Sequence, residues 1–246
     1  MIFKKILRYL TVASLAILTI FLITSHKTKA EDTSKLFDSK AVQKIVKRGT
    51  LNVGVKQDVP NFGYYSAKTN SYEGMEVDLA KKIADELKVK VNYIPVTTQT
   101  REPLMDNGTI DLLIATYTIN DERKASYAIS TPYYYDQIGF LVLKDSGINK
   151  ISDLNGKTIG VSQGASTKAA LQEYASANNL KFNYVQLGSF PELAVSLYAH
   201  RVDAFSVDKS ILSGYESKKT KTLKEGFKTQ EYGIASSKSN HCLLYT

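Results

Sequence analysis

The chain has 246 residues, of which 43% are hydrophobic and 23% charged, a balance typical of soluble globular proteins that argues against disorder. Its single cysteine, Cys242, excludes a disulfide-stapled scaffold, and its single long apolar run, at the N-terminus, excludes a membrane protein with several spans. The net charge of +8 suits a nucleic-acid-binding protein only where the basic residues gather on one surface.

The first thirty residues have the order of a secretory signal segment. Lys4, Lys5 and Arg8 precede an apolar run over residues 10–23, and a polar stretch leads to Ala30, where we expect cleavage. The alternative is an uncleaved signal anchor, although the run is short for a full membrane span. We therefore expect a secreted protein, in the periplasm or at the outer face of the cytoplasmic membrane.

Removal of this segment changes what the net charge implies. Residues 31–246 contain 27 basic and 24 acidic residues, so this part carries a net charge of only +3. A weak positive charge exerts little long-range attraction on phosphate. We therefore expect no nucleic-acid partner.

The first half of this part alternates between strand and helix signals. Residues 51–55 alternate and are rich in β-formers, which predicts a strand, whereas Met75, Leu79, Ile83 and Leu87 recur every four residues, which predicts a helix. A strand over residues 91–94, a short helix over 101–107 and a strand over 110–115 follow. This β-α-β-α-β order favours a mainly parallel sheet flanked by helices.

A similar pattern begins again in the second half. The predicted elements are strands over residues 138–143, 158–161, 183–187 and 204–207 and helices over 167–177, 191–199 and 209–215. Two α/β units of this kind form a cleft, and ligands of open α/β sheets bind at the carboxyl ends of the strands. We expect the boundary between the two units near residues 139–146.

Five segments resemble one protein family, in order and at the expected spacings: GMEVDLAKKIADEL (74–87), TREPLMDNGTIDLLIATYTINDERK (100–124), STPYYYDQIGFLVLK (130–144), LNGKTIGVSQGAST (154–167) and RVDAFSVDKSILSGY (201–215). They are similar to the family 3 extracellular solute-binding proteins, the receptors of polar amino-acid ABC importers, and within that family to the branch that binds glutamate and aspartate. The resemblance implies an α/β type II periplasmic-binding-protein fold, with two lobes, a ligand cleft and two crossing hinge strands. It implies lobe 1 over residues 31–139, lobe 2 over 140–231 and a return to lobe 1 over 232–246.

A closed cleft must satisfy the α-carboxylate, the α-ammonium and the side chain of an amino acid. Arg123 offers a guanidinium that matches a carboxylate, and the family's arginine at this position holds the α-carboxylate. Ser166 begins a predicted helix, whose N-terminus suits a carboxylate. Asp208 ends a predicted strand and matches the family's aspartate for the α-ammonium. The alternatives are a surface arginine paired with Asp121 or Glu122, and helix capping by Ser166 or Asp208.

Two further groups complete the predicted site. Thr116, Tyr117 and Thr118 form a turn whose backbone and hydroxyl groups match family positions that bond the ammonium or the carboxylate. Lys56 and Arg101 follow the first two predicted strands, and this pair of cations resembles that of the acidic-ligand branch. Two neighbouring cations repel each other unless an anion lies between them, and a ligand side-chain carboxylate would supply that anion. The alternatives are ordinary turn chemistry for the threonines and solvated charges for the cations.

We therefore predict a monomeric binding protein rather than an enzyme, which closes its lobes on glutamate or aspartate, with glutamine as a third candidate, and delivers the ligand to a membrane ABC permease. No cofactor or metal is expected, because the three histidines are dispersed. The alternatives are a dehydratase-like enzyme on the same scaffold and a non-transporting surface adhesin or sensor domain.

Residues 241–246 fit no family pattern, and we interpret them as the end of a truncated or frameshifted product with exposed apolar surface on lobe 1.

Overall fold

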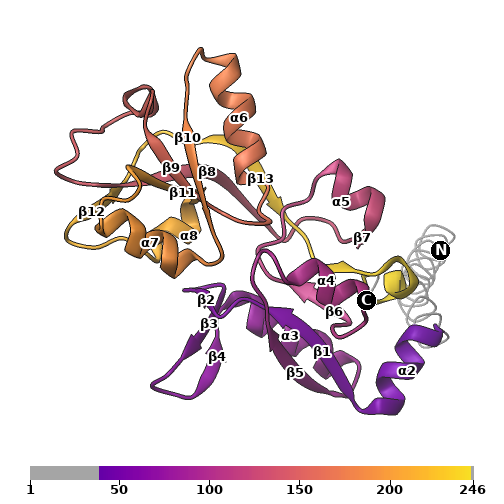
Figure 1. Cartoon of the computed structure of the whole chain (residues 1–246). Helices are drawn as coiled ribbons and strands as arrows, with labels where there is room; N and C mark the ends of the chain where they lie inside the picture. The colour runs from indigo at the N-terminus through magenta and orange to yellow at the C-terminus, as the bar shows by residue number, and fades with distance from the viewer. Residues whose placement is uncertain (1–38, 245–246) are drawn as a thin grey trace, which may run out of the picture.

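The computed structural model describes residues 39–244, and these form two α/β lobes (Figure 1). The predicted signal segment and its cleavage at Ala30 lie outside the described residues. We call the part built on the sheet that contains β1 lobe 1, and the part built on the sheet that contains β8 lobe 2. Figure 1 shows lobe 1 in indigo and magenta below and to the right of lobe 2, which is mainly orange.

Lobe 1 is built on a five-stranded sheet in the order β5-β1-β6-β14-β7. Strands β1, β5 and β6 are parallel, as the β-α-β-α-β pattern predicts, and β14 runs antiparallel to its neighbours β6 and β7. The strands are β1 (Thr50–Val55), β5 (Lys90–Pro95), β6 (Leu112–Ile114), β7 (Ala128–Ile129) and β14 (Ala235–Ser236). The helices are α2 (Lys40–Arg48), α3 (Met75–Glu86), α4 (Arg101–Asp106) and α5 (Asp121–Ser126).

Lobe 2 is built on a six-stranded sheet in the order β10-β9-β11-β8-β12, with β13 paired to β8. Strands β9, β10 and β11 are parallel, and β8 runs antiparallel to β11. The strands are β8 (Tyr134–Leu143), β9 (Thr158–Ser162), β10 (Asn183–Leu187), β11 (Ala204–Asp208), β12 (Thr220–Thr222) and β13 (Phe227–Tyr232). The helices are the 3-10 helix η1 (Ile151–Leu154) and the α-helices α6 (Thr167–Ala177), α7 (Phe190–Tyr198) and α8 (Lys209–Ser213).

Two chain segments connect the lobes, and they pair with each other. The Ser130 N–H donates to the Ile234 carbonyl at 2.9 Å, and the Tyr133 N–H donates to the Tyr232 carbonyl at 2.9 Å. Strand β8 begins at Tyr134, four residues before the predicted start, because its first half pairs with β13, a partner that no local pattern shows. The predicted domain bounds stay a prediction.

A small antiparallel sheet joins the two lobes on one side of the hinge. It consists of β2 (Asp58–Val59), β3 (Gly63–Ser66) and β4 (Ser71–Glu73). Val59 and Phe62 lie in the sequence of lobe 1, yet they pack with Leu141 and Phe205 in the apolar core of lobe 2. This apolar contact stabilises the two lobes against each other.

The last described element, η2 (Lys238–Leu244), packs on lobe 1. Leu243 is buried with Val42 and Ile45 of α2 and with Leu51 of β1. Leu243 therefore covers apolar side chains of α2 and β1, for which the sequence pattern alone showed no packing partner. The interpretation of the tail as a truncated product stays a prediction.

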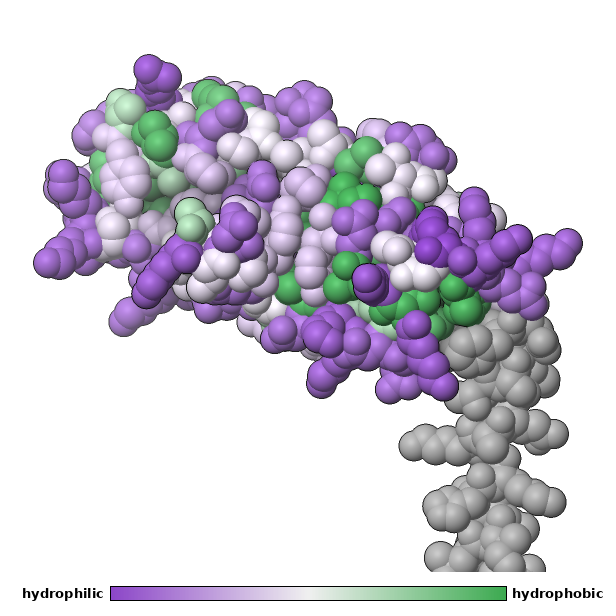
Figure 2. Space-filling model, turned by 90° about the horizontal axis from the view of Figure 1, so that it is seen from below, coloured by the Kyte–Doolittle hydropathy of each residue, from purple (hydrophilic) through white to green (hydrophobic). Residues whose placement is uncertain are grey.

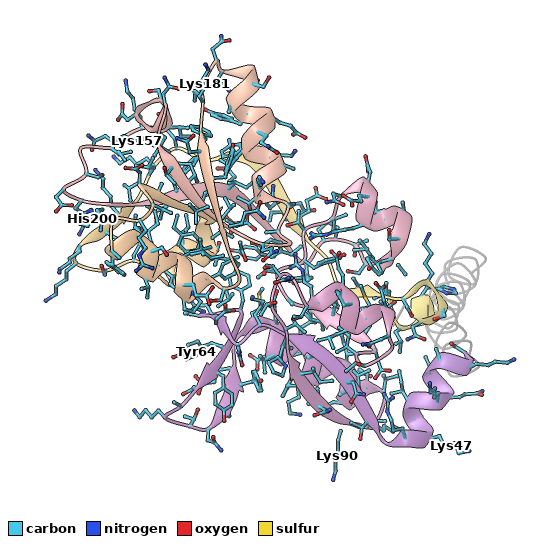
Figure 3. All side chains as sticks on the ribbon, in the orientation of Figure 1. Lys47, Tyr64, Lys90, Lys157, Lys181 and His200 are labelled. Carbon is cyan, nitrogen blue, oxygen red and sulfur yellow. The ribbon has the colours of Figure 1, made fainter. Side chains whose placement is uncertain are left out.

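The surface of the molecule mixes polar and apolar residues. Figure 2 shows one face on which apolar residues lie in small groups among hydrophilic ones. Lys47 and Lys90 lie at the outer edge of lobe 1, and Lys157 and Lys181 lie near each other at the outer edge of lobe 2 (Figure 3). The two pairs of lysines therefore lie on different lobes and do not share one surface. Among the residues 39–244, no helix has the length and apolar content that crossing a membrane requires.

Candidate functional site

The predicted site residues gather where the carboxyl ends of strands from both lobes meet. In lobe 1, Lys56 directly follows β1 and Thr116 lies two residues after β6. In lobe 2, Asp208 is the last residue of β11, and Ser162 is the last residue of β9. Ends of parallel strands are the common ligand position in open α/β sheets.

The two lobes contact each other directly at this place. Thr98, between β5 and α4, makes a 2.6 Å hydrogen bond to the Ser162 hydroxyl and donates to the Gln163 carbonyl at 2.7 Å. The Tyr215 hydroxyl of lobe 2 donates to the Asp58 carbonyl of lobe 1. The two lobes are therefore joined by direct hydrogen bonds beside the predicted site.

Arg123 is buried, with 6% of its surface exposed, near the start of α5. Its Nη1 donates to the Thr118 carbonyl at 2.8 Å and its Nε to Glu102 at 3.2 Å, and its guanidinium lies 4.0 Å from the centre of the Tyr117 ring. The alternative reading, a surface arginine paired with Asp121 or Glu122, is wrong because the arginine points inward and pairs with Glu102.

Lys56 and Arg101 are both buried, with 1% and 2% exposure, which excludes the reading as solvated charges. The Lys56 ammonium lies 3.0 Å from the Asp58 carboxylate and 4.7 Å from the centre of the Phe190 ring of lobe 2. Burial lowers the pKa of Lys56, although the charge of Asp58 acts in the opposite direction.

Arg101 begins α4 and points under the turn that follows β6. Its Nη1 donates to the carbonyls of Ala115 at 3.1 Å and Thr116 at 3.5 Å. Its Nε is buried without a hydrogen-bond partner among the described residues. Burial, and after it the charge of Arg123, lowers the pKa of Arg101 to about 9, so a further acceptor or anion would stabilise this guanidinium.

The turn Thr116-Tyr117-Thr118 forms the floor of the site. Thr116 has a φ of 45°, a left-handed conformation that is uncommon outside glycine, and its N–H donates to Glu76 at 2.6 Å. The Tyr117 ring is fully buried beneath both arginines, and its hydroxyl donates to Glu102 at 2.9 Å. The structure therefore brings Tyr117 to the site as a supporting ring.

Ser166 stands directly before α6 of lobe 2, across from Arg123. Its side chain makes no capping hydrogen bond to the helix, so the reading as a plain helix cap is wrong. Ser166 and Arg123 both line a cavity of about 370 Å³ between the lobes, together with Glu102, Asn120 and Gly164. This cavity is the point at which the predicted carboxylate-binding groups of the two lobes reach solvent.

Asp208 is buried at the end of β11, with 5% exposure, and its side chain does not cap α8. Its carboxylate accepts a hydrogen bond from the Tyr232 hydroxyl. Burial raises the pKa of Asp208 to about 7, and the charges of Arg101 and Arg123 act on it in the opposite direction. Asp203, which precedes β11, accepts the Thr158 N–H at 2.8 Å.

Four further tyrosines, Tyr64 and residues 133–135, divide into two groups. Tyr133 and Tyr134 contact the Tyr232 ring at the hinge, with ring centres 6.4 Å and 5.7 Å from it. Tyr64 points outward from β3 with 41% exposure (Figure 3), and Tyr135 is 62% exposed. The rings of the first group therefore pack at the hinge, whereas those of the second group are exposed.

Sequence reasoning missed the three carboxylates that accompany the cations: Glu102, which pairs with Arg123, and two more near Lys56 and Arg101. Asp58 pairs with Lys56, and Glu76 on α3 is fully buried and acts electrostatically on both Lys56 and Arg101. The spacing of two residues between Lys56 and Asp58 carried a weak signal. Glu76 carried none, because a glutamate in the first turn of an amphipathic helix is ordinarily a helix-dipole residue.

Comparison with known proteins agrees with this fold. The family described as "Bacterial extracellular solute-binding proteins, family 3" matches residues 51–228. The chain is 33% identical to the glutamine-binding protein of Geobacillus stearothermophilus, over 97% of this chain and 96% of that protein. It is 27% identical to the glutamate/aspartate import solute-binding protein of Salmonella typhimurium, over 87% of this chain and 72% of that protein. The chain belongs to the family 3 extracellular solute-binding proteins.

Solved structures show the same fold. The arginine-bound form of truncated ArgBP from T. maritima has a TM-score of 0.75 and 29% identity, over 82% of this chain and 94% of that one. An ancestral amino acid-binding protein, AncCDT-1, described as a precursor of cyclohexadienyl dehydratase, has a TM-score of 0.74 and 29% identity, over 82% of this chain and 88% of that one. The type II two-lobe fold expected from the sequence is confirmed.

Proposed function

We propose that this protein is the extracytoplasmic substrate-binding component of an amino-acid ABC importer and that it binds glutamate or aspartate by lobe closure. The observation that carries the proposal is the pair of opposite buried charges on the two lobes, Arg123 on lobe 1 and Asp208 on lobe 2. An α-amino acid carries the complementary charges on adjacent atoms. A zwitterion between the lobes satisfies both groups, and each buried charge is expensive without it.

The buried cations Lys56 and Arg101 support an acidic side chain. Burial disfavours the charged form of both groups, as their lowered pKa values express, and a ligand carboxylate would offset this cost. Asp58 already neutralises much of the Lys56 charge, so the choice between glutamate and glutamine rests mainly on Arg101. Glutamine is the competing ligand, and the name of the Geobacillus relative supports it.

Transport and location follow from the family. A relative from Bacillus subtilis is named an ABC transporter glutamine-binding protein, the Salmonella relative is named an import solute-binding protein, and the family is described as extracellular. These names support a membrane permease as partner and a place outside the cytoplasm. We further propose a monomer that catalyses no reaction. The test of the last point is incubation with a cyclic dienoate substrate of the dehydratase type, from which we expect no product.

Calorimetric titration of the purified protein with glutamate, aspartate, glutamine and arginine tests the proposal. We expect binding of the acidic ligands to be tightest and no heat from arginine, because three buried cations repel its side chain. Lys56→Gln and Arg101→Gln should weaken the acidic ligands more than glutamine. The exposed Lys90→Gln is the matched control. A folded protein that binds none of the four ligands contradicts the proposal.

A further inference from the structure

Glu76 is the second residue of α3, and its side chain is 0% exposed. Burial of an ionised carboxylate inside a protein costs roughly several kcal/mol of folding free energy unless hydrogen bonds or cations compensate its charge. No role was assigned to this residue from the sequence. Its surroundings connect it to the part of the site that faces the ligand side chain.

Two hydrogen bonds hold one oxygen of this carboxylate. Glu76 Oε1 accepts the Thr116 N–H at 2.6 Å and the Tyr133 hydroxyl at 2.6 Å, so it ties the left-handed Thr116 to the hinge segment. Arg101 donates to the Ala115 and Thr116 carbonyls of the same turn. Glu76 and Arg101 therefore bind the same turn from opposite sides, and the position of each side chain depends on that turn.

Glu76 also compensates the two buried cations. Its negative charge favours the charged forms of Lys56 and Arg101, and their charges favour the ionised form of Glu76 against the burial that raises its pKa. The second oxygen, Oε2, is buried without a hydrogen-bond partner among the described residues. This carboxylate therefore acts on the cations mainly through its charge.

We infer that Glu76 is a specificity-determining residue of the binding site: as the internal counter-ion of Lys56 and Arg101, it opposes a ligand side-chain carboxylate and limits the preference for an acid over its amide. The inference rests on the proposed function, because it assigns the Lys56 and Arg101 end to the ligand side chain. It differs from a purely structural role, which would affect glutamate and glutamine alike.

The test is the ratio of the glutamine and glutamate dissociation constants in Glu76→Gln. Glutamine keeps an oxygen that accepts the Thr116 N–H, removes the negative charge and places an amide NH2 where Oε2 stood. We expect the preference for glutamate to rise about tenfold, the size of an interaction worth one pK unit. Asp78→Asn is the matched control, because Asp78 is an exposed carboxylate on the same helix, and it should leave the ratio unchanged.

Tyr133→Phe is a milder second variant, which decides the question where Glu76→Gln does not fold. It removes one hydrogen bond that stabilises the ionised Glu76, so the ratio should shift in the same direction, by about threefold. An unchanged ratio in the folded variants, or an equal loss for both ligands, overturns this inference alone. Absence of binding by the unmodified protein overturns the proposed function and this inference with it.

Discussion

The two lobes contribute opposite charges to the site, and they compensate them differently. Lobe 1 carries three buried cations, and each has a partner in the same lobe: Asp58 for Lys56, Glu102 for Arg123, and backbone carbonyls for Arg101. Lobe 2 carries Asp208, whose carboxylate accepts from the neutral Tyr232 hydroxyl and has a pKa raised by burial to about 7.

This difference indicates where a ligand gains most. The cationic half is preorganised by carboxylates and carbonyls of its own lobe, so a ligand must share partners that already exist there. The anionic half lacks a cation in its own lobe among its described hydrogen bonds, so an ammonium group supplies a missing charge. The two halves should therefore respond differently to mutation and to pH.

The largest effect should come from the removal of the α-carboxylate partner. Arg123→Ala should weaken every amino-acid ligand about 1,000-fold, since a buried, hydrogen-bonded charge pair contributes several kcal/mol. Calorimetric titration measures the loss. Arg201→Ala is the control, because Arg201 is an exposed arginine of lobe 2. An affinity within tenfold of the unmodified protein would show that Arg123 does not hold the ligand.

Ligand affinity measured as a function of pH should show the effect of Asp208, the buried carboxylate of lobe 2. Because Asp208 must be ionised to bind an ammonium, the affinity should fall about tenfold for each pH unit below its pKa of about 7. The folding stability of the protein without ligand should change with pH in the opposite direction. A carboxyl whose pKa is raised above its unfolded value of 3.8 stabilises the fold at low pH and loses this contribution as pH rises towards 7.

Asp208→Asn separates this group from other titrating residues. The variant should bind about 100-fold more weakly at pH 8 and show no steep loss of affinity between pH 7 and pH 5. Asp145→Asn, at an exposed carboxylate of the same lobe, should retain the profile of the unmodified protein. A pH profile that persists in Asp208→Asn would assign the proton to another group.

The smallest effect should come from the contact between the lobes. Thr98→Val removes the buried hydrogen bonds to Ser162 and Gln163 and leaves the volume of the side chain nearly unchanged. We expect all ligands to bind about threefold to tenfold more weakly, because the closed form loses about 1 kcal/mol. Thr109→Val, at an exposed threonine of lobe 1, is the control. Equal affinities for both variants would exclude a role of Thr98 in closure.

Most regular elements of both sheets could be predicted from local patterns. The parallel strands β1, β5, β6, β9, β10 and β11 and the helices α3, α6 and α7 lie close to their predicted bounds. Helix α5 was missed, because its six residues, Asp121–Ser126, carry no apolar periodicity. The short strands β7 and β14 were missed as well, because a strand of two residues exists only through its neighbours.

The sequence by itself determined the order of the elements and the positions of Lys56, Thr116 and Asp208 at or just beyond strand ends, because periodicity and chain order are local properties. Only the tertiary structure decided which carboxylate compensates which cation, that β8 extends to meet β13, and that Leu243 covers α2. Apart from Lys56 and Asp58, these pairings join residues well separated in the chain, and their energies depend on burial and distance. Neither quantity exists before the elements of each lobe are packed together.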